Sequence, residues 1–131
     1  MAEQSLLQAE QLYGVKKESI YTVTQLTDYI RKKIHSDNNL IQIYVLGEIT
    51  DISKPNSGHI YFSLKDESSL LSCAFFRQNN KTLAFGLEQG MEVLCFGSLT
   101  IYEDKSTYQL DVASVYPVGE GALWLKFKQT K

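Results

Sequence analysis

The sequence predicts a mainly β protein: a five-stranded Greek-key barrel with an N-terminal helix and a short helix between strands 3 and 4. Two observations carry this prediction. The spacing of apolar residues changes from a helical period to alternation at Leu40, and alternation recurs up to Tyr116. Five alternating runs lie in that region, separated by segments rich in Gly, Asn, Asp and Ser. At 131 residues, 44% of them hydrophobic, the chain is long enough for one packed domain.

The charge balance argues against a protein that binds by overall charge alone, because 13 basic and 15 acidic residues give a formal net charge of −2. A local groove can still be positive on such a protein. No apolar run approaches the roughly 20 residues that cross a bilayer, and the first residues lack the pattern of a secretory signal, so no membrane association is expected. Cys73 and Cys95 lie in apolar runs without ligand spacing to a histidine. We therefore expect buried thiols, a cytoplasmic location, no metal and no cofactor.

The N-terminal part of the sequence predicts a flexible or marginally helical segment that is followed by a clear helix. Residues 1–20 are polar and mixed, which is typical of a flexible or marginally helical segment. Thr22 and Gln25 have the spacing of a capping box, so a clearer helix begins there and ends at Asp37-Asn38-Asn39. Steps of three and four residues make one apolar stripe along this helix. The stripe consists of Val23, Leu26, Ile30 and Ile34.

The five strands follow from apolar residues that alternate with polar ones. Their predicted ranges are 40–50, 59–65, 70–76, 92–102 and 107–116. Residues 54–58 form a loop rich in turn residues, and Gly97 inside the fourth run predicts a bulge or a bend.

A short helix is predicted between the third and fourth strands, capped by Asn79-Asn80, carrying Leu83 and Leu87, and stopped by Gly90. A five-stranded barrel with a helix at this place is the layout of the OB fold. Ligands of OB folds usually lie across strands 2 and 3, between the loops that join strands 1–2 and 4–5. Those parts are here residues 59–76, 52–58 and 103–106.

Candidate nucleic-acid contacts lie on the outer face of the second strand, in the stretch GHIYFSLKDE (58–67). The side chains expected to point into the barrel are Ile60, Phe62 and Leu64. Those expected to point outwards include His59, Tyr61 and Lys65. A tyrosine between two potential cations suits single-stranded nucleic acid, because bases stack on the ring while cations meet phosphates. On a generic barrel, a solvated strand with one exposed aromatic is the alternative.

Neighbouring positions extend this surface. Ser72 and Ala74 are small and would leave an open shelf beside Tyr61, with Phe76 and Arg77 at its end. An equal alternative places Phe76 in the core. The candidates in the two loops and at the mouth of the barrel are Lys54, Lys105 and Tyr102. Each of these residues has an alternative interpretation. Lys54 and Lys105 could be ordinary solvated loop lysines, and the ring of Tyr102 could simply cover the end of the barrel.

Five segments resemble, in the same order, the N-terminal domain of the exonuclease VII large subunit. They are YTVTQLTDYI (21–30), VLGEITDISKPNSGHIYFSLKDE (45–67), CAFFR (73–77), GMEVLCFGSLTIYE (90–103) and YQLDVASVYPVGEGAL (108–123). The most specific part runs from Gly47 to Glu67, where SGH, YF and LKD occur together.

The resemblance implies an OB domain over residues 21–118 that binds single-stranded DNA and presents it to a separate catalytic domain, which hydrolyses the DNA to oligonucleotides. It also implies that the catalytic residues and the coiled coil for the small subunit lie outside this chain, and that residues 119–131 begin the connection to the catalytic domain. The chain alone is then expected to lack catalysis. The alternatives are a protein-docking OB module and an RNA- or tRNA-binding one. The candidate nucleic-acid-binding residues are Lys54, His59, Tyr61, Lys65, Phe76, Arg77, Tyr102 and Lys105.

Overall fold

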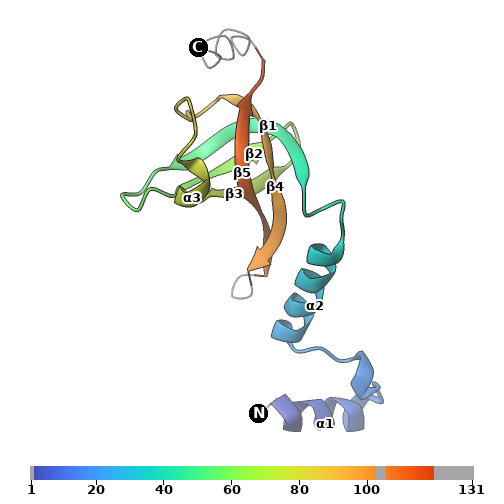
Figure 1. Cartoon of the computed structure of the whole chain (residues 1–131). Coiled ribbons are helices and arrows are strands. Elements are labelled where there is room, and N and C mark those ends of the chain that lie inside the picture. Colours follow the sequence, from blue (N-terminus) through green and yellow to red (C-terminus); the bar gives the residue numbers. More distant parts are fainter. Residues whose placement is uncertain (1, 103–105, 120–131) are drawn as a thin grey trace.

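The computed structural model describes residues 2–102 and 106–119, and these form a closed five-stranded barrel preceded by two α-helices (Figure 1). The strands are β1 (Ile43–Ser53), β2 (Ile60–Lys65), β3 (Leu70–Phe75), β4 (Glu92–Tyr102) and β5 (Thr107–Pro117). Around the barrel their order is β1-β2-β3-β5-β4, and β3 and β5 form the parallel pair among antiparallel neighbours. The predicted mainly β fold, a five-stranded OB barrel, is confirmed.

The barrel interior is filled by alternate residues of the strands, as period-two alternation requires. On β2, Phe62 and Leu64 are each 3% exposed, and Ile60 packs against the same core. The predicted inward side of this strand is therefore confirmed. Cys73 and Cys95 are buried free thiols, as expected.

Gly97 marks an irregularity between β4 and β5, where the pairing register shifts between Phe96 and Gly97. A Cβ atom at Gly97 would lie 2.2 Å from the carbonyl oxygen of Asp111. The backbones of β4 and β5 are too close at this point for a side chain to fit between them, so glycine is required at position 97. The predicted bulge or bend at this position is confirmed.

The helix between β3 and β4 is earlier and shorter than predicted. Helix α3 covers only Arg77–Asn80, and Phe76 occupies its N-cap. The segment with Leu83 and Leu87 is not helical, so the predicted helix that continues to Gly90 is wrong in its bounds. Leu87 still enters the core, where it is 1% exposed.

The side chain of Asn80 ties the end of α3 to the barrel. Its amide nitrogen donates hydrogen bonds to the carbonyl oxygens of Gly58, at 2.9 Å, and Phe75, at 3.0 Å. These bonds anchor α3 to the β1–β2 loop (residues 54–59) and to the end of β3.

Helix α2 (Val23–Ser36) begins as predicted. The hydroxyl oxygen of Thr22 accepts the backbone N–H of Gln25 at 3.1 Å, and the side-chain oxygen of Gln25 accepts that of Thr22 at 3.0 Å. This reciprocal capping box satisfies two N–H groups that the first helical turn leaves without partners. Helix α1 (Ala2–Tyr13) and a short 3-10 turn (Lys17–Ser19) precede it.

Most of the apolar stripe of α2 stays exposed: Val23 is 77% exposed, Leu26 45% and Ile30 39%. Helix α2 contacts β4, where His35 Nε2 lies 2.9 Å from Thr100 Oγ1. The hydroxyl of Thr27 also lies 2.7 Å from that of Ser106, in the turn before β5. Figure 1 shows α1 and α2 extending away from one end of the barrel.

Two sets of predicted features lie outside the described residues. One is the candidate Lys105 with most of its loop, residues 103–105. The other is the predicted connection to a catalytic domain, of which only Gly119 is described. Among the described residues, no helix is long and apolar enough to span a membrane.

Candidate nucleic-acid interface

Three of the predicted site residues form one aromatic cluster on the outer face of β2. The ring centroids of His59 and Phe76 are 5.4 Å apart, those of His59 and Tyr61 6.3 Å, and those of Tyr61 and Phe76 6.4 Å. All three pairs meet edge to face, which is a favoured geometry for aromatic rings. Phe76 is half-buried in this cluster while Phe75 enters the core at 1% exposed, so the two phenylalanines divide between the two faces.

A backbone hydrogen bond fixes the ring of His59 in the aromatic cluster. The backbone N–H of Arg77 donates to Nδ1 of His59 at 3.0 Å. Nδ1 is the acceptor in this bond, so Nε2 is the ring nitrogen left for a ligand. His59 therefore offers an aromatic face and its Nε2 edge to the outer face of the barrel.

Lys65, the other expected cation on β2, has an acidic partner. Its ammonium lies 3.5 Å from a carboxylate oxygen of Glu48, which is its cross-strand neighbour on β1. Both side chains are about half exposed, so the pair is a weak surface ion pair. Lys65 also borders a groove of about 390 Å³ that Glu67 and Glu92 line as well. These carboxylates make its surroundings unfavourable for a phosphate.

The side chain of Arg77 packs against the β1–β2 loop. Gly58 has φ +91°, and a Cβ atom there would lie 3.0 Å from Cδ of Arg77, so the aliphatic stem of Arg77 packs directly on the glycine. Within the described part of the chain, neither Arg77 nor Lys54 forms an ion pair. Lys54 belongs to the same β1–β2 loop that Arg77 packs on, and both cations are exposed there.

The centre of the outer face is polar, and sequence analysis missed its two main residues. Gln109 Nε2 donates to a carboxylate oxygen of Asp111 at 3.0 Å and to the hydroxyl of Tyr102 at 3.2 Å. We call Tyr102, Gln109 and Asp111 the acceptor patch. Alternation in the fifth run places Gln109 and Asp111 outside the barrel, on either side of the buried Leu110. That signal was present, but only the β3–β5 pairing puts them beside the candidate site.

Tyr102 is held protonated by its surroundings. Burial raises the pKa of its phenol, and the charge of Asp111 together with a hydrogen bond to that carboxylate raises the pKa further. The phenol of Tyr102 therefore stays protonated at physiological pH.

The open shelf predicted at Ser72 and Ala74 is wrong in part. Ser72 is exposed, but Ala74 is 0% exposed. Its cross-strand partners are Tyr61 on β2 and Asp111 on β5, and partners in a sheet share one face. The larger side chains on both sides cover the small one, so the position is filled rather than open.

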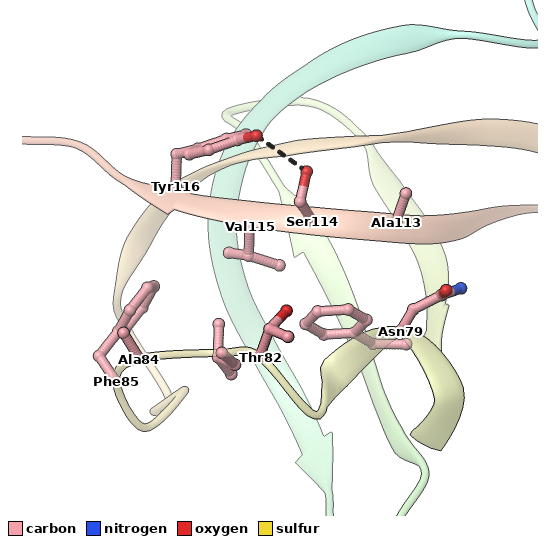
Figure 2. Close-up of a pocket in the computed structure, with 10 residues that line it drawn as sticks. Asn79, Thr82, Ala84, Phe85, Ala113, Ser114, Val115 and Tyr116 are labelled. Atoms are coloured by element: carbon pink, nitrogen blue, oxygen red, sulfur yellow. Dashed lines mark hydrogen bonds between the residues drawn. The ribbon is translucent and has the colours of Figure 1, made fainter. Parts of the chain in front are cut away.

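A pocket of about 230 Å³ lies between β5 and the segment after α3 (Figure 2). Ala113 to Tyr116 form one wall, and the other includes Asn79 and residues 82–85. The hydroxyl of Ser114 donates to that of Tyr116 at 3.1 Å, as the dashed line in Figure 2 marks. None of the predicted site residues that the structure describes lines this pocket.

Residues 21–116 match the family described as the OB-fold nucleic acid binding domain. The match covers the barrel and α2 together. The chain belongs to this family.

The relatives of this OB-fold nucleic acid binding domain confirm the resemblance drawn from its motifs. Over 114 residues, 87% of the chain, it is 40% identical to the exodeoxyribonuclease 7 large subunit of Pasteurella multocida and 42% identical to that of Natranaerobius thermophilus. The chain covers 25% and 27% of those proteins, so it spans about a quarter of the curated relatives it matches.

Solved structures confirm the fold of this OB-fold nucleic acid binding domain. A chain of the replication protein A heterotrimer bound to ssDNA superimposes with a TM-score of 0.50 at 12% identity, covering 69% of each chain. At that identity the likeness concerns the fold alone.

The structure brings some of the predicted site residues of this domain together and places others apart. The structure brings together His59, Tyr61, Phe76 and Arg77. It joins Tyr102 to the acceptor patch, leaves Lys54 in the β1–β2 loop and pairs Lys65 with Glu48. Within the described ranges, no group of His, Cys, Asp and Glu side chains has the arrangement of a metal site.

Proposed function

We propose that this domain binds single-stranded DNA across the outer face of β2, β3 and β5. The aromatic cluster is the observation that carries the proposal. It gives a base three ring surfaces from two neighbouring strands, and Tyr61 remains 40% exposed at its centre. Stacking of a base on such a ring contributes about 1–3 kcal/mol and depends little on sequence.

The positions of the cations support the same proposal. Arg77 is tied to His59 through its backbone N–H, and the stem of its side chain packs on Gly58, the residue before that histidine. Lys54 lies in the loop that Arg77 packs against. A phosphate backbone that follows this edge meets both charges while its bases turn towards the rings.

The geometry favours single strands over duplex. Tyr61 projects from β2, and a base must leave its own stack before it can lie on that ring. In a duplex each base is stacked on both faces and paired along one edge, so binding would cost the free energy of opening the helix.

The longer proteins that the chain resembles are named exodeoxyribonuclease large subunits. We propose that this domain presents DNA to a catalytic domain that hydrolyses phosphodiester bonds, and that a small subunit binds elsewhere in the same large subunit. A cytoplasmic location completes the proposal, because Cys73 and Cys95 would stay reduced there.

Fluorescence anisotropy with labelled oligonucleotides tests the proposal. Single-stranded DNA should bind more tightly than a duplex of the same sequence, and log Kd should depend on log salt with a slope of about 0.7 per phosphate contacted. Binding to duplex alone, or no binding at low salt, would contradict it. A clear preference for the matching RNA would favour the RNA-binding alternative, and a folded domain that binds no nucleic acid would favour the docking alternative.

A further inference from the structure

The acceptor patch presents hydrogen-bond acceptors and few donors. A carboxylate only accepts hydrogen bonds, so the amide atom of Gln109 that lies 3.0 Å from an oxygen of Asp111 is the donor Nε2. That nitrogen carries two hydrogens, and the second points to the Tyr102 hydroxyl at 3.2 Å. Both N–H donors of the Gln109 amide are therefore used inside the patch.

The acceptors are not used up in the same way. Gln109 Oε1 has no hydrogen-bond partner among the described residues. A carboxylate offers about four acceptor positions, and the contacts from Gln109 and Tyr102 occupy only part of that capacity at Asp111. Both side chains are only half-buried, so the remaining lone pairs face solvent. A ligand that reaches this patch meets acceptors.

The acceptor patch lies within reach of a base stacked on Tyr61. Tyr61 pairs with Ala74, and Ala74 pairs with Asp111, so the three residues form one row across β2, β3 and β5. Two strand spacings separate the outer members of this row by about 10 Å between Cα atoms. The residue between them carries only a methyl group, so no tall side chain stands between the ring and the carboxylate.

We propose that Asp111, oriented by Gln109 and Tyr102, makes this surface prefer nucleobases that offer an exocyclic amino group, such as cytosine, over bases that offer a carbonyl in the same place. The inference rests on the proposed function, because it requires a base on the aromatic cluster. Carboxylates accept the N4 amino group of cytosine, whereas uracil and thymine carry the acceptor O4 at that position.

The charge of Asp111 also determines how a bound strand is oriented on this face. A carboxylate in the centre of the face repels phosphates, while Arg77 and Lys54 attract them at its edge. The backbone should therefore run along the loop edge with its bases turned inwards, which brings their Watson–Crick edges to the acceptor patch.

A comparison of oligo-dC with oligo-dU of about ten nucleotides, at neutral pH and by anisotropy, tests the inference. The two bases differ at the exocyclic group and the adjacent ring nitrogen, and both stack weakly, so stacking does not obscure the result. We expect oligo-dC to bind about fivefold more tightly. Asp111→Asn keeps the shape, removes the charge and adds an N–H donor that suits O4. It should strengthen oligo-dU binding and remove the preference.

Glu88→Gln is the matched control. Glu88 is exposed in the segment before β4, so this change also removes one negative charge but should leave the ratio of the two affinities unchanged. Equal binding of oligo-dC and oligo-dU by the unmodified protein, or a preference that survives Asp111→Asn, would overturn the inference and leave the proposed function intact. Failure of both oligonucleotides to bind would instead reject the proposed function, and the inference with it.

Discussion

His59 and Phe76 meet edge to face, with their ring centroids 5.4 Å apart and their ring planes at 89°. His59 directly precedes β2 and Phe76 directly follows β3, so the contact closes the loop end of the β2–β3 pair. The Arg77 N–H bond to Nδ1 fixes the imidazole from the other side. This end of the face is therefore ordered before any ligand arrives, which lowers the entropy cost of binding.

Tyr61→Ala should weaken binding of single-stranded DNA by about 1–3 kcal/mol, because the mutation removes the central ring of the aromatic cluster. Tyr44→Ala is the control, since Tyr44 is an exposed aromatic that contacts Phe96 on the β1–β4 side of the barrel. Anisotropy titrations of both variants measure the difference. A larger loss for the Tyr44 variant would reject the assignment of the face.

Arg77→Gln should reduce the salt dependence of binding, because one phosphate contact disappears while most of the aliphatic stem on Gly58 stays. The slope of log Kd against log salt should fall by about 0.7. Lys17→Gln, in the turn before α2, removes an equal charge far from the face and should leave the slope unchanged. An unchanged slope in the Arg77 variant would mean that Arg77 contacts no phosphate.

Gly58→Ala should destabilise the protein by about 1–3 kcal/mol, because φ +91° is unfavourable for a residue with a side chain and the new methyl group would displace Arg77. Single-stranded DNA binding should weaken with it. The control is Gly86→Ala, whose added methyl group meets open space, so that stability should stay the same or rise by less than about 1 kcal/mol. Chemical denaturation measures both. Equal stabilities of the two variants would contradict the role given to Gly58.

Cys73 and Cys95 should resist thiol reagents in the folded protein. Burial raises the pKa of Cys95 to about 12, and burial, with the neighbouring Cys95, raises that of Cys73 even further. Labelling at neutral pH should therefore require denaturant. Since the unfolded thiols ionise near their ordinary pKa of 9.0 and the folded ones do not, the free energy of unfolding should decrease as the pH rises above that value. Rapid labelling without denaturant would contradict the burial.

Much of the fold could be predicted because its signals are local. Alternation alone identified the inward side of β2, and the spacing of Thr22 and Gln25 alone identified the capping box. Glycine at position 97 indicated the bulge for a similarly local reason, since a strand of alternating residues tolerates glycine mainly where it bends or is crowded.

The site was harder to predict because its contacts join distant parts of the chain. The pairing of Lys65 with Glu48 depends on the β1–β2 register, and the place of Asp111 depends on the parallel β3–β5 pair. The anchoring of α3 to the β1–β2 loop depends on a bond from Asn80 to Gly58. The stripe on α2 was visible in the sequence, but its periodicity does not say which side of a helix meets the barrel.

The central claim is that single-stranded DNA lies across the aromatic cluster and the acceptor patch. Amide chemical-shift mapping during titration with an oligonucleotide tests it most directly. We expect the largest changes at residues 59–61, 74–77 and 109–111, with little change along α2. Changes confined to α2, or to the pocket between residues 82–85 and β5, would contradict the claim.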